Sequence, residues 1–395
     1  MDRIAFYVAH EFHRAILEPV YEEIRQQFSA LITQDRERII AYRPRVLVLS
    51  CAHGSMFRRR LPETAIIWTR HGFANKRWIR RSIEGCDFAC LSSEWVRSDF
   101  ERRGLRPRLG TWITGFVPMD WVFHGQLPRR SKSPTMLFAP TWNPSLSAAP
   151  IIGEEAFEQI CSEFPNLRVL IKPHPATPDR NPEWMETWRR IARRHPMVHL
   201  IDDVHANVYD LIGEVDVLLS DVSSVIFYFL AVDRPIILVD SPEDQRDVSV
   251  IDPDAPEWVW RDVGLRIDCP AKLCSAVKRC LTHPEEKADV RAKYRGRVFG
   301  EGLNNRASKL MAQNISMLLR PAPEEQKFAE LTWNAIRTFG AYEQRIRELE
   351  ERARKSEAYN ALVESLPLHL SRSLDRYPLL KRSLRTIIHK VVRKK

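Results

Sequence analysis

The sequence predicts an α/β protein with two parallel-sheet domains and a helical C-terminal tail. Short apolar runs rich in β-branched residues alternate with amphipathic helical patterns, as in parallel sheets that carry helices on both faces. A polar stretch with Pro and Ser, Gln126 to Pro134, divides this alternation into two series. Pro321 and Pro323 end the second series, and the charged, helical pattern of residues 324–358 follows.

The chain of 395 residues is long enough for two domains and an appendage. Its hydrophobic content of 44% and charged content of 28% are ordinary for a globular protein, so each domain can bury a core. We therefore expect an N-terminal domain at residues 1–125, a second domain at 126–320 and the tail at 321–395.

Each predicted element follows from its own local pattern. The predicted strands are Ile4–Val8, Val46–Ser50, Ala65–Thr69, Phe88–Leu91, Gly110–Thr114, Thr135–Ala139, Arg168–Lys172, Val198–Ile201, Val217–Ser220 and Ile236–Val239. Amphipathic helices are predicted at Leu17–Gln27, Ser93–Arg103, Glu154–Glu163, Trp184–Arg194 and Ala271–Leu281. Ligands of open α/β sheets collect at the carboxyl ends of strands, so residues that carry chemistry should follow directly after strands.

Several features indicate a soluble protein that is made and kept in the cytoplasm. The apolar stretch from Ile4 to Ala9 has the length of a strand rather than of a signal peptide, and no run approaches the ~20 apolar residues that span a bilayer. The seven cysteines are scattered without a CxxC pair, which favours free thiols in a reducing compartment. Cys86 and Cys90 could share a helix face, but partner ligands for a metal are missing.

The basic charge of the chain is concentrated near its end. Of the net charge of +10, residues 367–395 contribute nine basic side chains against the single acid Asp375. Apolar residues recur there with helical spacing, at positions 379, 380, 384, 387, 388, 391 and 392. This pattern predicts a basic amphipathic helix on an anionic membrane surface. A helix docked on the protein itself and a nucleic-acid contact are the alternatives, and the scarcity of interleaved aromatic residues disfavours nucleic acid.

The first chemical motif follows the strand Ala65–Thr69 and contains His71, Gly72 and Lys76. A histidine at a strand end can act as a general base on a hydroxyl group. Gly72 allows close approach of the backbone, and Lys76 can hold a phosphate as a point charge. A turn with a capping histidine is the alternative interpretation of this motif.

Three further motifs follow strands of the second series. Thr141 comes after Thr135–Ala139 and could bind a phosphate or cap the next helix. Lys172 and His174 stand in a Lys-Pro-His-Pro segment whose prolines fix the backbone, which favours a phosphate-binding pair over a merely rigid loop.

The fourth motif is an Asp-Val-Ser-Ser segment, Asp221 to Ser224, that precedes an apolar helix. Two hydroxyl groups beside the free N–H groups of a helix N-terminus form a ready anion site. An ordinary N-cap is the alternative for the serine pair alone.

Taken together and in this order, these motifs resemble the CDP-glycerol glycerophosphotransferase family, which makes teichoic-acid and capsule polymers. The resemblance covers roughly residues 60–310, and Gly302 with Arg306 is similar to the family's closing segment. It implies two Rossmann-like domains that face a cleft, the glycosyltransferase-B arrangement. It also implies transfer of glycerol phosphate, or a similar polyol phosphate, from a CDP-activated donor to an acceptor hydroxyl, with release of CMP.

The resemblance also implies roles for single residues. His71 would activate the acceptor hydroxyl, and His174 would lie near the donor pyrophosphate. The remaining implied donor-side residues are Gly72, Lys76, Thr141, Lys172, Asp221, Ser223 and Ser224, with Asp221 shaping the turn.

The resemblance further implies the partners and the cofactors. The acceptor would be a lipid-linked molecule or a polysaccharide, and the enzyme would work on the inner face of the cell membrane without nucleic acid. No cofactor is required, and Mg²⁺ bound with the CDP donor is compatible with this chemistry.

The sequence departs from the family pattern where Phe73, Ala74 and Val222 replace a common Thr, Pro and aromatic residue. These changes bear on the acceptor and on the donor alcohol. Two other functions remain open: a nucleotide-sugar glycosyltransferase of the same architecture, and a non-catalytic membrane-associated scaffold.

Overall fold

The computed structural model describes residues 2–73, 79–125, 133–203, 206–241, 249, 252–300 and 306–354. By its internal contacts the chain divides into two compact units, Met1–Ile336 and Arg337–Lys395. The first unit contains both of the six-stranded parallel sheets. The predicted membrane helix at 379–392 lies outside the described residues, as do Lys76 and Gly302.

The first sheet has the strand order β2-β1-β3-β4-β5-β6. Its strands are β1 (Arg3–Tyr7), β2 (Ser29–Thr33), β3 (Val46–Leu49), β4 (Ala65–Thr69), β5 (Phe88–Leu91) and β6 (Gly110–Ile113). Its helices are α1 (Arg14–Ile24), α2 (Arg36–Tyr42), α3 (Gly54–Arg60), α4 (Ile79–Ile83), α5 (Glu94–Arg102) and α6 (Asp120–His124), with short 3-10 turns at Glu11–His13 and Val117–Met119. Every residue of β3, β4 and β5 is buried, as expected for strands covered on both faces.

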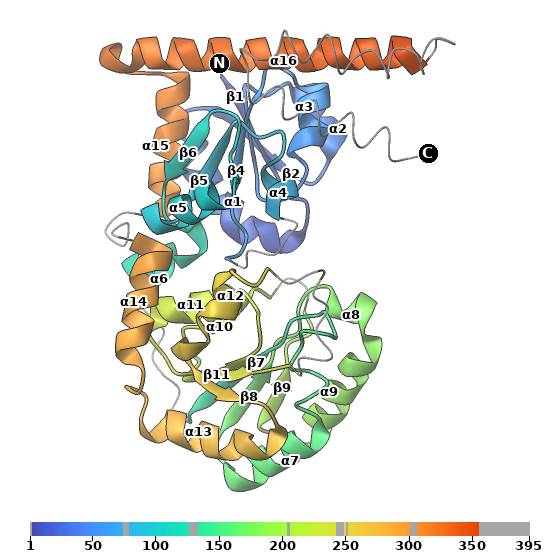
Figure 1. Ribbon diagram of the computed structural model, residues 1–395, viewed down its shortest axis with the longest axis vertical. Helices are drawn as coiled ribbons and strands as arrows, with labels where there is room; N and C mark the ends of the chain where they lie inside the picture. Colours follow the sequence, from blue (N-terminus) through green and yellow to red (C-terminus); the bar gives the residue numbers. More distant parts are fainter. Residues whose placement is uncertain are drawn as a thin grey trace. The chain divides into compact units, whose positions relative to one another are not determined.

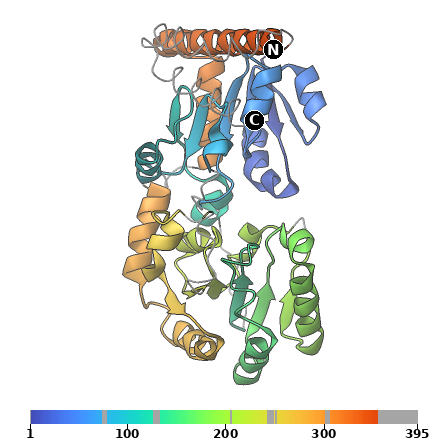
Figure 2. The same ribbon diagram turned by 45° about the vertical axis from the view of Figure 1, so that its right-hand side comes forward.

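The second sheet has the order β12-β11-β10-β7-β8-β9. Its strands are β7 (Thr135–Ala139), β8 (Arg168–Ile171), β9 (Val198–Leu200), β10 (Val217–Ser220), β11 (Ile236–Val239) and β12 (Leu265–Ile267). Its helices are α7 (Glu154–Glu163), α8 (Thr177–Arg180), α9 (Pro182–Arg194), α10 (Val208–Leu211), α11 (Val225–Val232), α12 (Pro256–Val259), α13 (Leu273–Thr282) and α14 (Ala288–Phe299), with 3-10 turns at Arg261–Val263 and Pro270–Lys272. Helices lie on both faces of each sheet (Figures 1 and 2).

After α14 the chain returns to the first sheet. Helix α15 (Ala307–Leu319) packs on α1, and its Met311 and Ile315 are fully buried in the core of the first sheet. A 3-10 turn at Pro323–Glu325 then leads into α16 (Gln326–Arg354), whose Trp333 joins the same core. The two-domain α/β fold predicted from the sequence is confirmed.

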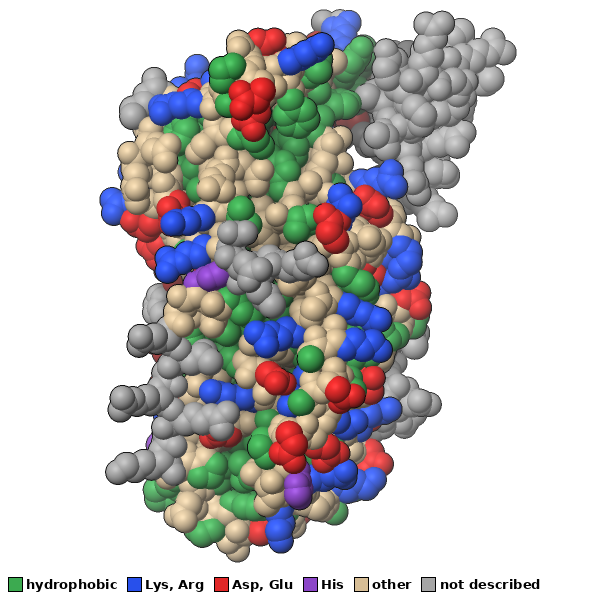
Figure 3. Space-filling model, turned by 90° about the vertical axis from the view of Figure 1, so that its left-hand side faces the viewer, with side chains coloured by type: hydrophobic (Ala, Val, Ile, Leu, Met, Phe, Trp, Pro, Cys, Tyr) green, Lys and Arg blue, Asp and Glu red, His purple; other side chains and the backbone are tan. Residues whose placement is uncertain are grey.

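Two surface properties bear on function. Among the described helices, none combines the length and apolar character needed to cross a bilayer. Figure 3 shows basic and acidic side chains interspersed over the described part of one face, rather than a single-sign field. This agrees with the sequence, because most of the net positive charge belongs to residues 367–395.

Candidate functional site

The predicted motifs lie at or one strand away from the topological switch points of the two sheets. In the first sheet the strand order reverses between β1 and β3, and in the second between β7 and β10. Open α/β sheets bind their ligands at the carboxyl ends of the strands that flank such a point. In the second sheet Ser220 of β10 is paired in register with Ala139 of β7, so the segments that begin at Pro140 and Asp221 leave the sheet side by side.

His71 follows β4 and is held at its side chain by the neighbouring strand end. Its Nδ1 lies 2.6 Å from the carbonyl oxygen of Ser50, the residue after β3. A carbonyl oxygen only accepts, so Nδ1 carries the proton and Nε2 is the basic nitrogen of the neutral ring. His71 therefore has the tautomer that a general base requires, and the hydrogen bond at Nδ1 fixes the orientation of its ring.

Three histidines that sequence reasoning missed form a cluster with His71, centred on His13. The ring of buried His13 lies 5.4 Å from the rings of both His71 and His10, and the side chain of His53 follows β3. Burial, and then repulsion by His71 and His10, lowers the pKa of His13 to about 2, so His13 is neutral. The available signal was a histidine shortly after each of two predicted strands, Ile4–Val8 and Val46–Ser50.

Arg70 shapes the loop that carries His71. Its buried guanidinium donates from Nε to the carbonyl oxygen of Gly72 at 2.9 Å and from Nη2 to that of Phe73 at 2.8 Å. Burial lowers the pKa of Arg70 to about 10, an effect that Glu257 and Asp99 oppose. These two hydrogen bonds from a buried side chain fix the conformation of the loop after β4.

Phe73, one of the three residues that depart from the family pattern, packs between the two sheets. Its ring lies 4.5 Å from Phe116 and 5.6 Å from Phe299, measured between ring centroids, and 6.2 Å from Tyr228 of α11. An aromatic side chain here therefore extends the hydrophobic contact between the two domains.

At the second edge, Asp221 organises the backbone. Its buried carboxylate accepts N–H groups from Thr141 at 2.8 Å, Ala148 at 2.9 Å and Val222 at 2.7 Å. Burial raises the pKa of Asp221, while these N–H groups act in the opposite direction. The carboxylate points to the protein backbone, so Asp221 shapes the turn, and Thr141 is buried beside it.

Lys172 and His174 follow β8, the strand next to β7. Lys172 is buried, and burial lowers its pKa although Asp203 and Asp202 oppose this shift. The N–H of Ala176 donates to Nδ1 of His174 at 3.1 Å, so the proton of its neutral ring is on Nε2. His174 thus presents an N–H donor, the opposite of His71, and suits contact with an anion.

The serine pair begins α11. Ser223 and Ser224 directly precede its first residue, Val225, and both are half-buried. The hydroxyl oxygen of Ser223 accepts the N–H of Val225 at 3.4 Å. All eight residues of α11 are apolar or aromatic and seven are buried, so the helix is anchored and its N-terminal N–H groups face the strand edge.

The structure brings the first motif against the fourth. A Cβ atom built on Gly72 would lie 2.9 Å from the Ser224 hydroxyl oxygen and 3.2 Å from that of Tyr228. The carbonyl oxygen of His71 accepts hydrogen bonds from Tyr209 at 2.8 Å and from Tyr228 at 3.2 Å. The loop that carries the candidate base therefore contacts the candidate phosphate site across the two sheets.

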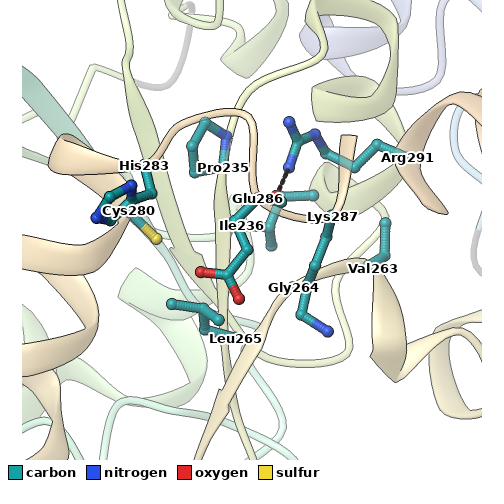
Figure 4. A pocket seen from close by; sticks show the side chains of 10 residues that line it. All are labelled: Pro235, Ile236, Val263, Gly264, Leu265, Cys280, His283, Glu286, Lys287 and Arg291. Carbon is teal, nitrogen blue, oxygen red and sulfur yellow. Dashed lines mark hydrogen bonds between the residues drawn. The ribbon is translucent and has the colours of Figure 1, made fainter. Parts of the chain in front are cut away.

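A small pocket elsewhere carries no such chemistry. It lies where β11 and β12 begin, at the opposite edge of the second sheet from the motifs (Figure 4). Its volume of about 10 Å³ is near the lower limit for one water molecule. Buried Arg291 donates to the carbonyl oxygen of Glu286 at 2.6 Å and pairs with Asp233 at 2.8 Å. The guanidinium group is therefore already paired with neighbouring groups of the protein.

Within the described residues, no group of His, Cys, Asp and Glu side chains has the arrangement of a metal site. All seven cysteines have free thiols. Burial raises the pKa of Cys51, Cys86 and Cys90, so these thiols are poor nucleophiles.

Comparison with known proteins gives a family signal and a fold signal. Residues 122–299 match the model of a family described as CDP-glycerol:poly(glycerophosphate) glycerophosphotransferase. No curated protein matches the sequence significantly. The family resemblance seen in the motifs is thus confirmed for the part of the chain that forms the second sheet.

Solved structures share the fold at low sequence identity. The wall teichoic acid polymerase TagF, in a crystal soaked with CDPG, has a TM-score of 0.59 at 15% identity, over 81% of this chain and 90% of that one. The UDP-GlcNAc 2-epimerase from Neisseria meningitidis, bound to UDP-GlcNAc, has a TM-score of 0.54 at 11% identity, over 80% and 99%. The S. aureus MnaA structure with UDP has 0.55 at 12%, over 82% and 98%.

Proposed function

We propose that this chain, in which residues 122–299 form a domain of the CDP-glycerol:poly(glycerophosphate) glycerophosphotransferase family, transfers a polyol phosphate from a CDP-activated donor to an acceptor hydroxyl. The family match and the fold together point to a transferase of this type. Glycerol phosphate is the proposed transferred group, and a lipid-linked or polysaccharide chain is the proposed acceptor.

The reaction assigns a separate task to each sheet. Nε2 of His71 accepts the proton of the acceptor hydroxyl as the oxygen attacks the β-phosphorus of the donor. A new P–O bond forms to the acceptor, and the bond from that phosphorus to the bridging oxygen breaks. The bridging oxygen keeps the electron pair and leaves as part of CMP.

The second sheet would neutralise the charge of the pyrophosphate. N–H groups at the start of α11, the hydroxyls of Ser223 and Ser224, Lys172 and the Nε2–H of His174 all suit phosphate oxygens. Lys76 would add a further contact and lies outside the described residues. A Mg²⁺ ion that arrives with the CDP donor is compatible with this arrangement.

One observation carries the proposal. Gly72, next to the candidate base His71, is packed so closely on Ser224 that a Cβ atom would lie 2.9 Å from its hydroxyl oxygen. An acceptor hydroxyl bound at His71 would therefore be close to a phosphate bound at the serines, as in-line transfer requires.

Two further parts of the proposal concern location and the alternative chemistry. The basic segment at 367–395 would hold the protein on the inner, anionic face of the membrane, near a lipid-linked acceptor. Because enzymes that bind UDP-sugars share this fold, a nucleotide-sugar glycosyltransferase is the second candidate.

The test measures CMP release by the full chain from CDP-glycerol and CDP-ribitol, with membranes as the source of a lipid-linked acceptor. We expect acceptor-dependent CMP that both His71→Ala and His174→Ala abolish while the proteins remain folded. His199→Ala, at an exposed position of β9, is the matched control and should keep full activity. Absence of CMP from every CDP-polyol, together with turnover of a nucleotide sugar, would replace this proposal with the glycosyltransferase.

A further inference from the structure

Two buried tyrosines, from helices of the second sheet, form hydrogen bonds with the backbone of His71. Tyr209 of α10 and Tyr228 of α11 both donate to its carbonyl oxygen, at 2.8 Å and 3.2 Å. Both side chains are buried, and their hydroxyl oxygens are 3.4 Å apart. The imidazole itself is held by the Ser50 carbonyl oxygen, so the position of His71 is fixed at its ring and at its backbone.

One of these tyrosines, Tyr228, also lies at the candidate phosphate site. Tyr228 lies beside Ser224, the residue that precedes α11: a Cβ atom built on Gly72 would lie 3.2 Å from the first hydroxyl oxygen and 2.9 Å from the second, and a hydrogen bond from Ser224 acts on the Tyr228 hydroxyl. A tyrosine hydroxyl has one proton, and the geometry aims the Tyr228 proton at the His71 carbonyl. The hydrogen bond between Ser224 and Tyr228 therefore uses the Ser224 proton.

A bound phosphate would change this hydrogen-bond network. Phosphate oxygens of an ionised diester only accept, so a phosphate at the start of α11 takes the Ser224 proton away from Tyr228. The Tyr228 oxygen is buried; among the described groups, the Tyr209 hydroxyl lies 3.4 Å from it, and the Tyr209 proton is also donated to the His71 carbonyl oxygen. Donor binding and the backbone position of His71 are thus linked through three hydroxyl groups.

We propose that Tyr209 and Tyr228 are positioning residues that fix the backbone of His71 and connect it to the donor phosphate at Ser224. This inference rests on the proposed function, because it takes His71 as the base and Ser224 as a phosphate ligand. Neither tyrosine touches the reacting atoms, so their effect should appear in turnover rather than in binding of the donor.

The first test compares Tyr228→Phe and Tyr209→Phe in the full chain. Phenylalanine keeps the ring packing and removes only the hydroxyl. We expect kcat for CMP release to fall by about 10-fold or more, while KM for CDP-glycerol changes by less than about 3-fold. Tyr294→Phe is the matched control, since this buried tyrosine of α14 donates to Asp262 at 2.8 Å, and it should leave both constants unchanged.

The second test does not depend on turnover. In protein labelled with ¹⁵N-histidine, the ring signals of His71 are assigned through His71→Gln and followed as CDP is added. We expect CDP to shift these signals in the wild type and to shift them less than half as far in Tyr228→Phe. Loss of the response in Tyr228→Phe but not in Tyr294→Phe would support the link even if no CDP-polyol is turned over.

Two results would overturn the inference. One is a wild type that turns over CDP-glycerol while both phenylalanine variants keep kcat within about 3-fold. The other is a His71 signal that does not respond to CDP in the wild type, or that responds equally in Tyr228→Phe. A wild type that releases no CMP, with the His71 response intact, would refute the proposed function and leave the link standing.

Discussion

The carboxyl edges of the two sheets each contain a point where the strand order reverses, but they carry opposite chemistry. At the first edge, His10, His13 and His71 gather with His53 around a switch point. At the second, hydroxyl groups, backbone N–H groups and Lys172 gather around the equivalent point. One edge offers a proton acceptor and the other offers proton donors and positive charge, which is the division of tasks that phosphate transfer between two substrates requires.

The family signal follows the same division. The matched residues, 122–299, hold the whole second sheet and stop short of the first. The match therefore covers the sheet for which donor binding is proposed, and His71 lies outside the matched residues. Variants that each affect one edge test whether proton transfer and donor binding can be separated.

Replacing the proposed base His71 should remove proton transfer at the first sheet and leave the donor site of the second sheet intact. His71→Ala should lower kcat for CMP release by about 10²- to 10⁴-fold, because no other described group stands in the same place to accept the proton. The melting temperature should stay close to that of the wild type. Retention of most activity in His71→Ala would remove this residue from the mechanism.

Adding a methyl group should disturb the contact between the edges. In Gly72→Ala the new Cβ would lie 2.9 Å from the Ser224 hydroxyl oxygen, so the loop or the serine must move. We expect kcat to fall by about 10- to 100-fold. Gly110→Ala at the start of β6 is the control, since a Cβ there meets nothing within 4 Å, and equal loss in both variants would show a general effect.

The buried histidine of the first edge should make stability depend on pH. The folded-state pKa of His13 is lowered to about 2 from 6.5, so below pH 6.5 the unfolded chain binds one more proton than the folded chain. The free energy of unfolding should therefore fall on acidification, by about 2 kcal/mol between pH 7.5 and pH 5.0. His13→Gln cannot take up this proton.

Urea unfolding of the wild type and of His13→Gln across that pH range measures the effect. The difference in free energy between the two proteins should shift in favour of the variant as the pH falls. A difference that stays constant with pH would mean that His13 is protonated in the folded state.

Removing the positive charge of Lys172 should weaken donor binding at the second sheet and leave proton transfer at the first sheet unchanged. Lys172→Gln would delete the charge-assisted contact proposed between Lys172 and the donor, so KM for CDP-glycerol should rise by about 10-fold. The pH dependence of kcat should not change, because the base is on the other sheet. An altered pH profile in Lys172→Gln would contradict the separation of tasks.

Strands and helices were predictable where burial is complete or the pattern is strong. Val46–Leu49 and Ala65–Thr69 are central strands and were recognised from their apolar runs. The strands missed were β2 and β12, which lie at sheet edges. Residues of β2 are all half-buried and β12 has three residues, so neither carries a strong pattern.

The site could be predicted only where a motif is local. His71, His174 and Ser224 were proposed because each stands beside a strand end within a short motif. Tyr209 and Tyr228 lie 138 and 157 residues from His71 in the chain, and no local pattern relates them to it. Their contact with His71 forms only when the two sheets pack together, so it is a property of tertiary packing.

The most direct test of the two-edge account is calorimetric binding of CDP-glycerol to the full chain without acceptor. His71→Ala should bind the donor as tightly as the wild type, within about 3-fold, whereas the double variant Ser223→Ala/Ser224→Ala should bind at least about 10-fold more weakly. Equal weakening in both variants, or undiminished binding by the serine variant, would contradict the assignment of base and donor to different sheets.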